Sequence, residues 1–499
     1  MNTSMENIDV FIVGGGINGT AIAADAAGRG LSVILCEKND LASGTSSAST
    51  KLIHGGLRYL ESYELGLVKT ALREREVLMQ KAPHLIAPLE FILPHEKHLR
   101  PMWLIRIGLF LYDHLAKTSL PHSKRIHFKK DARGSSLLTK FKQGFSYYDC
   151  WTDDARLTLL NALAAKEHGA TILTQHEYIS AARENHHWKI QVKQASTQKT
   201  FYARVLINAA GPWINQVQAT INKKLFNLQL VKGSHIVVPK LFSGKFAYIL
   251  QNLDKRIIFA IPYQDKFTLI GTTDVACSND DINHIKISRG EESYLCSIIN
   301  KYFKKTISPH DIIWSYSGVR CLQGNSTGNL SKLSRDYKLA FDNENNVPLL
   351  TVIGGKITTH RRLAEEAVNK LTPLFPAMRP AWTASAPLPG GDFVNHDFQK
   401  FYTEFKNNFS WLPEKIAHHY AKNYGTRAYL ILDNAHQLAD LGKEVVPGLY
   451  QKELDYLIQH EWAKTAEDIL WRRTKLGLTL SQEEQQKLTD WFRTATLFF

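Results

Sequence analysis

The chain has 499 residues, more than the roughly 250–300 at which a single hydrophobic core stops growing, so we expect two or three domains. Hydrophobic residues make up 44% of the sequence and aromatic residues 10%, which excludes global disorder. The 61 Lys and Arg outnumber the 47 Asp and Glu, giving a formal charge of +14. This excess predicts a negatively charged partner: nucleic acid, an anionic membrane surface, or a phosphorylated or carboxylated small molecule.

Cysteine spacing and the N-terminus narrow the class of protein. The five cysteines are widely spaced and include no CxxC pair, which excludes a zinc ribbon or a disulfide scaffold and suits a reducing compartment. We predict no metal site. Met1–Ile8 lacks the basic and apolar regions of a secretory signal. Because no stretch of the sequence reaches the ~20 apolar residues of a spanning helix, we expect the protein to lie on any membrane that it meets.

The chain begins with a strand–turn–helix–strand pattern. Ile8–Val13 is a short apolar run rich in β-branched residues, which is typical of a buried parallel strand. A glycine-rich turn follows, then an Ala-rich helix over Thr20–Arg29 and a second strand over Leu31–Cys36. This order of elements predicts the first β-α-β unit of a doubly wound α/β domain.

The turn carries a dinucleotide-binding motif. Its glycines are Gly14, Gly16 and Gly19, and an acid, Glu37, closes the second strand. Glycines let the backbone approach a pyrophosphate, the helix N-terminus offers amides, and the acid can bond ribose hydroxyls. The sequence therefore predicts an adenine dinucleotide, and an acid rather than an Arg at position 37 argues against NADP.

The middle of the chain adds further elements. We expect a helix over Asp153–His168, an antiparallel meander over Tyr178–Tyr202, and many short strands between residues 229 and 340. Strands of the nucleotide domain return at Arg204–Ala209 and at Leu349–Ile353, before a helix over Lys356–Leu371. Because this domain is interrupted by β-rich insertions, the pattern favours FAD, buried between two domains, over NAD.

A composition change marks the last domain boundary. Residues 373–391 hold five prolines and a Gly-Gly pair, which neither a helix nor a central strand tolerates, and the residues beyond are almost wholly helical in pattern. Thr465–Asp468 and Ser481–Glu484 have the spacing of capping boxes. The predicted α/β fold has an FAD-binding domain (1–85, 150–225, 346–385), an inserted antiparallel-sheet substrate domain (86–149, 226–345) and a helical C-terminal domain (386–499).

Several blocks of sequence resemble one known family. They include Gly14-Gly-Gly-Ile-Asn-Gly19 and Thr45-Ser-Ser47. The most specific block is Lys51-Leu-Ile-His-Gly-Gly-Leu-Arg-Tyr-Leu-Glu61. Further matches are Gly271-Thr-Thr-Asp274, Tyr316-Ser-Gly-Val-Arg320, Gly354-Gly-Lys-Ile-Thr-Thr359 and Trp471-Arg-Arg-Thr-Lys475. From about residue 8 to about residue 490 the chain is similar to the FAD-dependent, aerobic-type glycerol-3-phosphate dehydrogenases.

The resemblance implies a fold like that of D-amino-acid oxidase. It also implies oxidation of sn-glycerol 3-phosphate to dihydroxyacetone phosphate by hydride transfer to FAD, with the electrons passed to a membrane quinone. Bacterial members lie on the cytoplasmic face of the inner membrane as peripheral homodimers. The sequence departs from the family pattern where Cys321 replaces Pro, His360 replaces Tyr and Ala210 replaces Thr. The first change removes a residue that fixes φ beside Arg320.

The chemistry suggests a role for each matching side chain. Oxidation of the alcohol needs a base, and we assign it to His235, whose alternative role is that of a structural His beside a strand. Arg320, expected at the end of a strand, and Arg58 are our phosphate clamp, against the alternative of surface or salt-bridging arginines. Lys356 is expected beside the flavin or substrate, where it would stabilise reduced flavin, and Tyr59 is expected to line the pocket. The other residues expected near the cofactor are Ser46, Ser47, Lys51, His54, Gly211, Gly354 and Gly355.

A short apolar helix is predicted over Pro101–Lys117. Arg106, Asp113 and Lys117 fall on one stripe and most other positions are apolar. Such a helix either belongs to the core or lies in a membrane interface, and it is too short and too charged to span the bilayer. We favour the interface, on an anionic membrane surface, because a quinone receives its electrons within the bilayer.

Two other functions compete with this prediction. One is a soluble flavin oxidase that acts on a related small substrate and returns the electrons to oxygen. The other is nucleic-acid binding, which the charge alone suggests. The sequence has no basic helix, no RNP motif and no patch of aromatics interleaved with Lys and Arg, so we predict no nucleic-acid partner.

Overall fold

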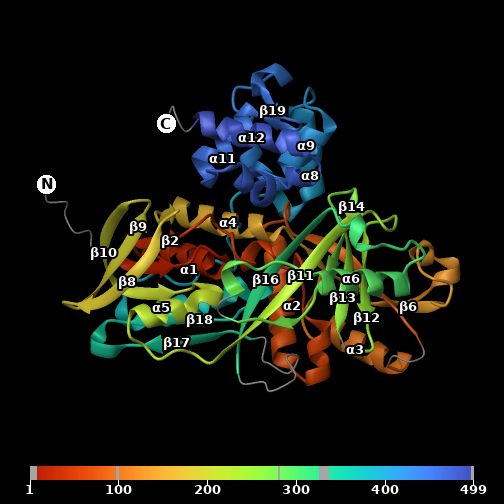
Figure 1. Cartoon of the computed structure of the whole chain (residues 1–499), viewed down its shortest axis with the longest axis horizontal. Coiled ribbons are helices and arrows are strands. Elements are labelled where there is room, and N and C mark those ends of the chain that lie inside the picture. The colour runs from red at the N-terminus through yellow and green to blue at the C-terminus, as the bar shows by residue number, and fades with distance from the viewer. Residues whose placement is uncertain (1–7, 97–99, 255, 279–280, 325–335, 496–499) are drawn as a thin grey trace.

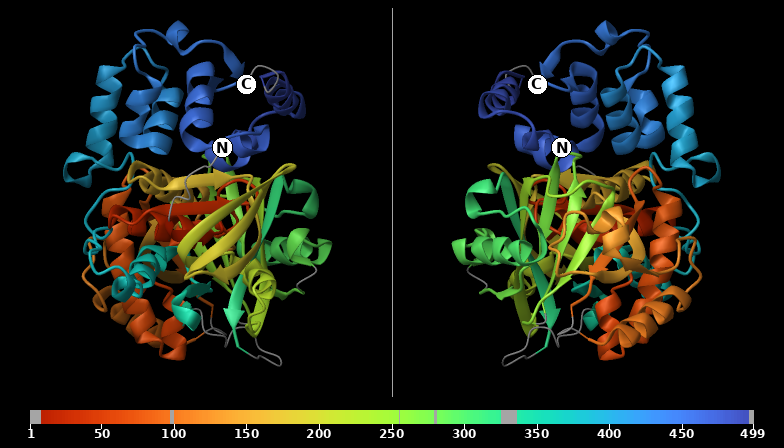
Figure 2. Two further views of the ribbon diagram at one scale, coloured as in Figure 1. Left: turned by 90° about the vertical axis from the view of Figure 1, so that its left-hand side faces the viewer. Right: turned by 90° about the vertical axis from the view of Figure 1, so that its right-hand side faces the viewer.

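The computed structural model of the chain describes residues 8–96, 100–254, 256–278, 281–324 and 336–495. The Met1–Ile8 segment, in which we expect no secretory signal, lies outside this range up to residue 7. Two sheets with their helices form the body of the molecule, and a separate group of helices forms a layer above it (Figures 1 and 2).

The first sheet is built around the predicted β-α-β unit. Its strands run in the order β17 (Lys338–Asp342), β18 (Leu349–Ile353), β10 (Thr197–Asn208), β1 (Ile8–Val13), β2 (Val33–Glu37) and β7 (Thr171–Thr174). β18, β10, β1, β2 and β7 are mutually parallel, as a doubly wound fold requires. The prediction of an α/β dinucleotide-binding fold is confirmed.

Alternating side chains of β1 face opposite sides of this sheet. Val10 and Ile12 join the core formed with α1 (Ile17–Gly28), α4 (Asp154–Glu167) and α7 (His360–Asn369). Phe11 and Val13 pack on the other face, which is covered by α5 (Ile214–Thr220) and by the strands β8 (Glu177–Glu184) and β9 (His187–Gln194). Both faces are buried, which explains the continuous apolar run of β1.

β10 differs from the prediction. We expected a meander strand ending near Tyr202 and a separate buried strand from Arg204, but the structure has one strand over Thr197–Asn208. Its first half pairs antiparallel with β9 and its second half pairs parallel with β1. No turn residue separates the halves, so the chain continues straight from the meander into the parallel sheet.

The second sheet forms the predicted antiparallel layer. Its strands follow the order β15 (Val275–Ala276), β11 (Leu228–Pro239), β14 (Phe267–Gly271), β13 (Ile257–Tyr263), β12 (Phe246–Gln251), β4 (Ala87–Pro94), β6 (Gln143–Trp151) and β3 (Leu52–Ile53). β16 (Trp314–Gln323) pairs with β11, and β5 (Lys124–His127) pairs with β6. The β12–β4 pair, which is parallel and not antiparallel as we predicted for this sheet, joins the two predicted segments of the substrate domain. One face packs against α6 (Arg289–Tyr302), and the other against α2 (Leu65–Lys81) and α3 (Met102–His114).

The two sheets exchange short segments at their margins. β3 lies within residues 1–85 but belongs to the second sheet, and β17 lies within residues 226–345 but pairs with β18 in the first. We propose that the chain re-enters the FAD-binding domain at β17. The same exchange brings the segment before β3 to the boundary between the sheets.

The C-terminal residues form a helical layer with its own core. Its helices are α8 (Phe398–Asn408), α9 (Glu414–Tyr424), α10 (Ala428–Ile431), α11 (Gln451–Glu461) and α12 (Gln482–Ala495). A small hairpin of β19 (Glu444–Val446) and β20 (Leu449–Tyr450) interrupts the predicted helical pattern. Both predicted capping boxes are confirmed, because Thr465 and Asp468, like Ser481 and Glu484, exchange side-chain and backbone hydrogen bonds.

Buried ion pairs hold this layer against the body. Arg156 of α4 pairs with Glu461, and Lys475 pairs with Asp153 at 2.8 Å, with all four side chains almost fully buried. Arg473 pairs with Asp40, which follows β2. The contacts therefore reach the first sheet and the start of α4.

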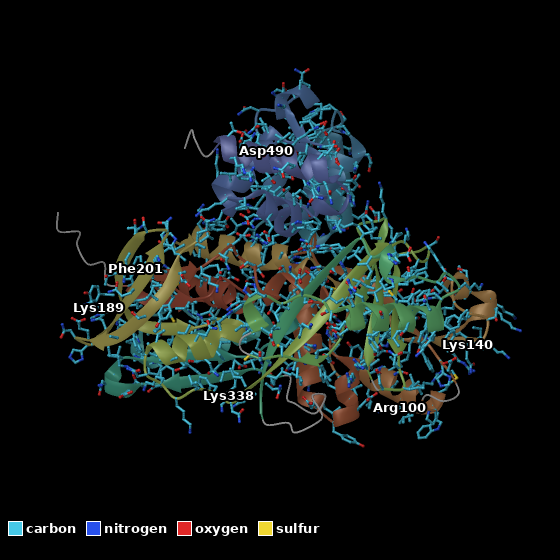
Figure 3. All side chains as sticks on the ribbon, in the orientation of Figure 1. Arg100, Lys140, Lys189, Phe201, Lys338 and Asp490 are labelled. Carbon is cyan, nitrogen blue, oxygen red and sulfur yellow. The ribbon has the colours of Figure 1, made fainter. Side chains whose placement is uncertain are left out.

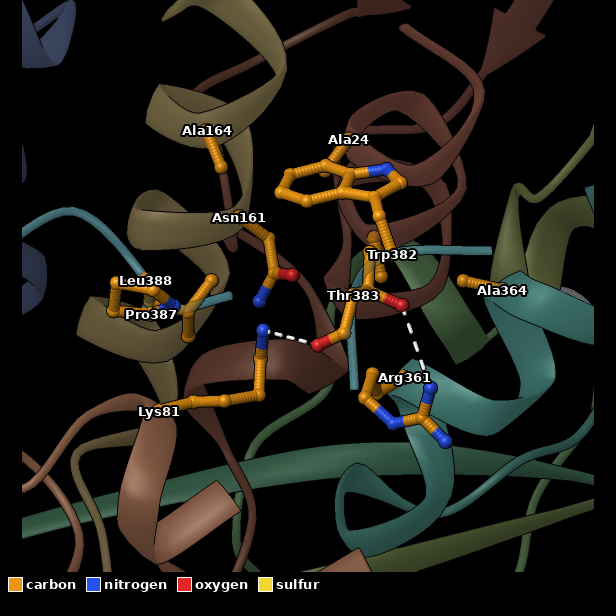
Figure 4. A pocket seen from close by; sticks show the side chains of 11 residues that line it. Ala24, Lys81, Asn161, Ala164, Arg361, Ala364, Trp382, Thr383, Pro387 and Leu388 are labelled. Carbon is orange, nitrogen blue, oxygen red and sulfur yellow. Dashed lines mark hydrogen bonds between the residues drawn. The ribbon is translucent and has the colours of Figure 1, made fainter. Parts of the chain in front are cut away.

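A cavity of about 10 Å³ lies where α1, α4 and α7 meet the Pro-rich segment (Figure 4). Lys81 and Arg361 point toward Thr383 there, and both donate hydrogen bonds to it. Burial, and then the nearby Arg361 charge, lowers the pKa of Lys81 to about 7. A cavity of this size holds a single water molecule, so it is a packing feature and not a substrate site.

α3, for which the sequence left a choice between core and membrane interface, is buried on one side and exposed on the other. Leu109 and Tyr112 are buried in the second core. Trp103 and Phe110 are 65% and 58% exposed, and the other exposed apolar side chains of this helix are Leu104, Ile107 and Leu111. No helix within the described ranges is long and apolar enough to cross a membrane.

Basic side chains are spread widely over the surface. Arg100 before α3, Lys140 in a turn before β6, Lys189 of β9 and Lys338 of β17 project outward from different parts of the body (Figure 3). These four side chains lie far apart in this view, so they do not form one basic patch.

Candidate active site

The turn between β1 and α1 needs its glycines for steric reasons. Gly14 has φ +112°, and a Cβ there would lie 2.6 Å from the Ala209 carbonyl oxygen. A Cβ on Gly19 would lie 2.0 Å from the carbonyl oxygen of Gly14. These contacts allow strand and helix to approach closely, which is the geometry of a pyrophosphate-binding turn.

The residues around this turn fit an adenine dinucleotide. Gly16 is the N-cap of α1 and provides no capping side chain, and a helix N-terminus of this kind binds anions. The Glu37 carboxylate accepts hydrogen bonds from the amides of Gly15 and Asn39, at 2.8 and 2.9 Å. Asn18 Oδ1 is buried and has no hydrogen-bond partner among the described residues. A bound ligand with polar atoms would give this oxygen a hydrogen-bond partner.

The segment from Thr45 to His54, called the bridging segment below, joins the turn to the second sheet. Ser46 Oγ accepts a hydrogen bond from the amide of Ile17 at 2.9 Å, at the start of α1. Thr45 Oγ1 donates to the Val319 carbonyl of β16 at 2.7 Å. The cofactor turn and β16 are thereby held at a fixed distance from each other.

Lys51, which we expected near the cofactor, is fully buried. Its ammonium pairs with Asp154 at 2.6 Å and donates to the Ser47 carbonyl at 3.0 Å. This ion pair holds the bridging segment against the start of α4. Ser47 contributes its carbonyl to the same arrangement.

His235 lies in β11, facing the bridging segment. Nε2 is 2.9 Å from Thr50 Oγ1, and Nδ1 is buried with no hydrogen-bond partner among the described residues. The ring stacks on Tyr316 with centroids 4.8 Å apart. Burial, and then the Lys51 and Arg320 charges, lowers the pKa of His235 well below its usual value. The imidazole is therefore neutral, as a base must be.

Only glycine leaves room for this ring. His235 is the register partner of Gly271 in β14, and a Cβ at Gly271 would lie 2.1 Å from His235 Cδ2. The glycine of the Gly271–Asp274 motif therefore has a direct steric purpose.

Arg320 lies within β16, not at a strand end as we expected. Its guanidinium pairs with Asp274, and Nη2 is 3.3 Å from the Thr273 carbonyl. Both contacts use Nη2, so neither of them uses the Nη1 and Nε donors of the guanidinium. Cys321 pairs with Leu230 in the adjoining strand, so the sheet orders the backbone where the family resemblance implies Pro.

Lys356 and Tyr59 meet on the other side of the bridging segment. The Lys356 ammonium lies 3.7 Å from the centroid of the Tyr59 ring. Gly354 and Gly355 have φ of +71° and +102°, and Asn18 donates to the Gly354 carbonyl at 3.0 Å. The glycine turn after β18 thus lies against the start of α1.

Three more predicted residues lie around this centre. His54 follows β3, its amide donates to Thr358 Oγ1 at 3.1 Å, and burial lowers its pKa. Arg58 is half-buried in the turn Leu57–Ser62. Gly211, with φ +57°, begins the turn after β10.

Some contributing residues were not among those predicted. Thr50 bonds His235, Asp274 orients Arg320, Tyr316 stacks on His235, and Asp154 neutralises Lys51. Asp274 and Tyr316 lie in the blocks quoted for the family resemblance, so those blocks held the signal. The Asp154–Lys51 pair spans 103 positions and leaves no local pattern.

Comparison with known proteins agrees with this geometry. The family model "FAD dependent oxidoreductase" matches residues 9–361, and "C-terminal domain of alpha-glycerophosphate oxidase" matches residues 381–493. A glycerol-3-phosphate dehydrogenase from Pseudomonas aeruginosa is 50% identical over 494 residues, which is 98% of this chain and 96% of the relative. A D-erythritol 1-phosphate dehydrogenase from Brucella abortus is 47% identical over 99% of both chains.

A solved structure has the same architecture. The glycerol-3-phosphate dehydrogenase from Bacillus halodurans, complexed with FAD, superposes with a TM-score of 0.76 at 26% identity. The match covers 98% of this chain and 94% of that one, so it includes the C-terminal layer.

Proposed function

The chain belongs to the family of FAD-dependent glycerol-3-phosphate dehydrogenases, and we propose that it oxidises sn-glycerol 3-phosphate to dihydroxyacetone phosphate and reduces a membrane quinone. FAD is its cofactor. The observation that carries the proposal is the bridging segment, which bonds both the start of α1 and His235. It supports a base held at a fixed place relative to the cofactor turn.

Bound FAD supplies the acceptor for the hydride that leaves C2 of the substrate. His235 takes the hydroxyl proton. The Thr50 hydroxyl, 2.9 Å from Nε2, and the stacked Tyr316 ring fix the orientation of this imidazole.

The cations of the site have separate roles in the proposal. Arg320, oriented by Asp274, and Arg58 bind the substrate phosphate. Lys356, beside Tyr59, lies next to the turn that faces the cofactor and provides positive charge for the reduced flavin. In this proposal, the substrate phosphate and the reacting carbon are therefore served by different side chains.

Arg320→Ala is expected to raise KM for glycerol 3-phosphate with a smaller change in kcat. A hydrogen bond to a charged group contributes about 1.5–3 kcal/mol, which corresponds to roughly 10- to 100-fold in KM. Steady-state kinetics of the variant and the wild type measure both KM and kcat. Arg256→Ala is the control, since that arginine pairs with Asp254 on the surface. Equal KM values for wild type and Arg320→Ala would place the clamp elsewhere.

The rate of flavin reduction is expected to resist acid. Because the pKa of His235 is lowered by burial, the imidazole stays neutral as the pH falls past the usual value of 6.5. Stopped-flow bleaching of the flavin at saturating substrate should therefore decline only below that pH. A midpoint at or above 6.5 would contradict a buried neutral base.

We propose that α3 holds the enzyme on the cytoplasmic face of the inner membrane. Its exposed Trp103 and Phe110 provide apolar surface of the kind that enters a membrane interface. In flotation with anionic vesicles, Trp103→Ser/Phe110→Ser should bind several-fold less than wild type. Val394→Ser/Leu430→Ser removes comparably exposed side chains from the C-terminal layer and should bind like wild type. Equal binding by all three proteins refutes the role of α3.

The electron acceptor and the substrate have direct tests. An oxidase of the same fold would return the electrons to oxygen, so hydrogen peroxide in place of reduced quinone would favour it. The Brucella abortus relative is named for D-erythritol 1-phosphate, so that compound is the competing substrate. A kcat/KM higher for it than for glycerol 3-phosphate would change the proposed substrate. The family resemblance also supports a homodimer.

A further inference from the structure

Two side chains of the C-terminal layer reach toward the bridging segment. Lys475 follows the helical turn Asp468–Arg473, and its ammonium is buried 2.8 Å from Asp153 Oδ2. Trp471, in the same turn, stacks on Trp314 of β16 with centroids 4.7 Å apart and planes at 17°. Neither side chain has a place in the function proposed above.

The contact between Lys475 and Asp153 is linked to the bridging segment by the neighbouring carboxylate of Asp154. Asp153 caps α4, because its side chain accepts a hydrogen bond from the amide of Arg156. Asp154 is fully buried and accepts from the Lys51 ammonium at 2.6 Å and from the Ser49 amide and hydroxyl at 2.9 and 2.7 Å. The start of α4 therefore ties Lys475 to Ser49 and Lys51.

Thr50 lies between these two anchored residues. Its hydroxyl is 2.9 Å from His235 Nε2. Ser49 and Lys51 are held on both sides of Thr50, so the position of the Thr50 hydroxyl is set by Asp154 and, through the neighbouring Asp153, by Lys475.

The second contact reaches the same histidine through stacked rings. Trp314 lies 4.9 Å from Tyr316, and Tyr316 lies 4.8 Å from His235, centroid to centroid. The Tyr316 hydroxyl donates to the Ser49 carbonyl at 2.9 Å. The ring path from Trp471 and the ionic path from Lys475 therefore converge on the bridging segment and on His235.

We propose that Lys475 and Trp471 are positioning residues for His235, so that docking of the C-terminal layer completes the orientation of the base. The inference rests on the proposed function of His235. Its physical basis is that proton transfer depends steeply on geometry, and a misplacement of about 1 Å costs on the order of 100-fold in rate. A partial displacement of Thr50 or Tyr316 is expected to cost less than that.

The test is a double-mutant cycle on the rate of flavin bleaching by glycerol 3-phosphate under nitrogen. Lys475→Met removes the charge at similar length. It should lower the bleaching rate about 10-fold, a fraction of the misplacement cost above, with KM within about twofold of wild type because Arg320 is untouched. In a His235→Ala background the same change should lower the residual rate less than about twofold, since the group that it positions is gone.

Lys464→Met is the matched control. Lys464 also belongs to the C-terminal layer and contacts the body, but it donates to the Thr174 carbonyl of β7 at 3.3 Å, whereas Lys475 bonds Asp153 at the start of α4. Its bleaching rate should equal that of wild type. If Lys475→Met does not fold, Trp471→Leu takes its place in the cycle with the same expectation. A crystal structure of the variant should show a Thr50 Oγ1–His235 Nε2 distance longer than 2.9 Å.

An unchanged rate in Lys475→Met and in Trp471→Leu overturns the inference. An equal fall in the wild-type and His235→Ala backgrounds also overturns it, because the effect then bypasses His235. Full turnover by His235→Ala alone has a different meaning, since it removes the proposed base itself.

Discussion

Replacing His235 by Ala is expected to lower the rate of flavin reduction by about 10²- to 10⁴-fold, the range that a positioned general base contributes. The reason is structural, because this imidazole is buried, neutral and oriented by Thr50 and Tyr316. Stopped-flow bleaching with glycerol 3-phosphate measures the rate. The visible spectrum of the variant should show FAD bound as in wild type, since the cofactor turn is formed by other residues.

His176→Ala is the matched control for this variant. His176 is also buried, and its ring bonds the Thr174 carbonyl at 2.9 Å; its contact with Glu37 is through the backbone amide, which the substitution leaves in place. It should reduce flavin at the wild-type rate. Comparable rates for His235→Ala and His176→Ala would show that His235 is a structural histidine, the alternative that the sequence left open.

The largest expected effect on stability comes from the Arg156–Glu461 pair. Both side chains are almost fully buried between α4 and α11. Glu461→Gln leaves the guanidinium without its counter-charge, and breaking a buried pair in this way costs about 3–5 kcal/mol. Urea unfolding followed by circular dichroism should show that loss in the transition of the C-terminal layer.

Two comparisons separate this effect from general damage. Asp490→Asn breaks the exposed pair with Arg493 and should cost less than about 1 kcal/mol. Arg156→Met/Glu461→Met removes both charges and should recover much of the loss, because no charge is left buried alone. A Glu461→Gln protein as stable as Asp490→Asn would contradict a tightly docked C-terminal layer.

The nucleotide half of the site could be predicted because its signals are local. The glycine motif, the apolar run of β1 and Glu37 all lie within the first 37 residues, and the structure places them as a pyrophosphate-binding turn requires. Steric requirements of this kind act on neighbouring residues, so they leave a pattern that can be recognised in a single sequence.

The tertiary contacts that hold the site residues in place could not be predicted from local signals. Lys51 belongs to a highly specific block, yet its role follows from Asp154, a partner about a hundred positions away, which turns a free cation into a buried ion pair. Arg320 was expected at a strand end and lies inside β16, because pairing with β11 extends the strand past the motif. Such outcomes depend on tertiary pairing, which local patterns do not encode.

The net charge of the chain likewise did not predict which basic residues act on a ligand. The +14 excess was compatible with several anionic partners. In the structure, the buried cations Lys51, Arg156 and Lys475 each pair with a carboxylate, while many others project from the surface. Only Arg58, Arg320 and Lys356 are proposed to act on a ligand, so net charge says little about the reaction.

One measurement tests the central claim most directly. The visible spectrum of the purified protein is recorded under nitrogen, first alone, then with glycerol 3-phosphate, then with a short-chain quinone. We expect oxidised flavin that bleaches on addition of the substrate and recovers with the quinone. A flavin that stays oxidised with glycerol 3-phosphate, while D-erythritol 1-phosphate bleaches it or no substrate does, would contradict the proposed function.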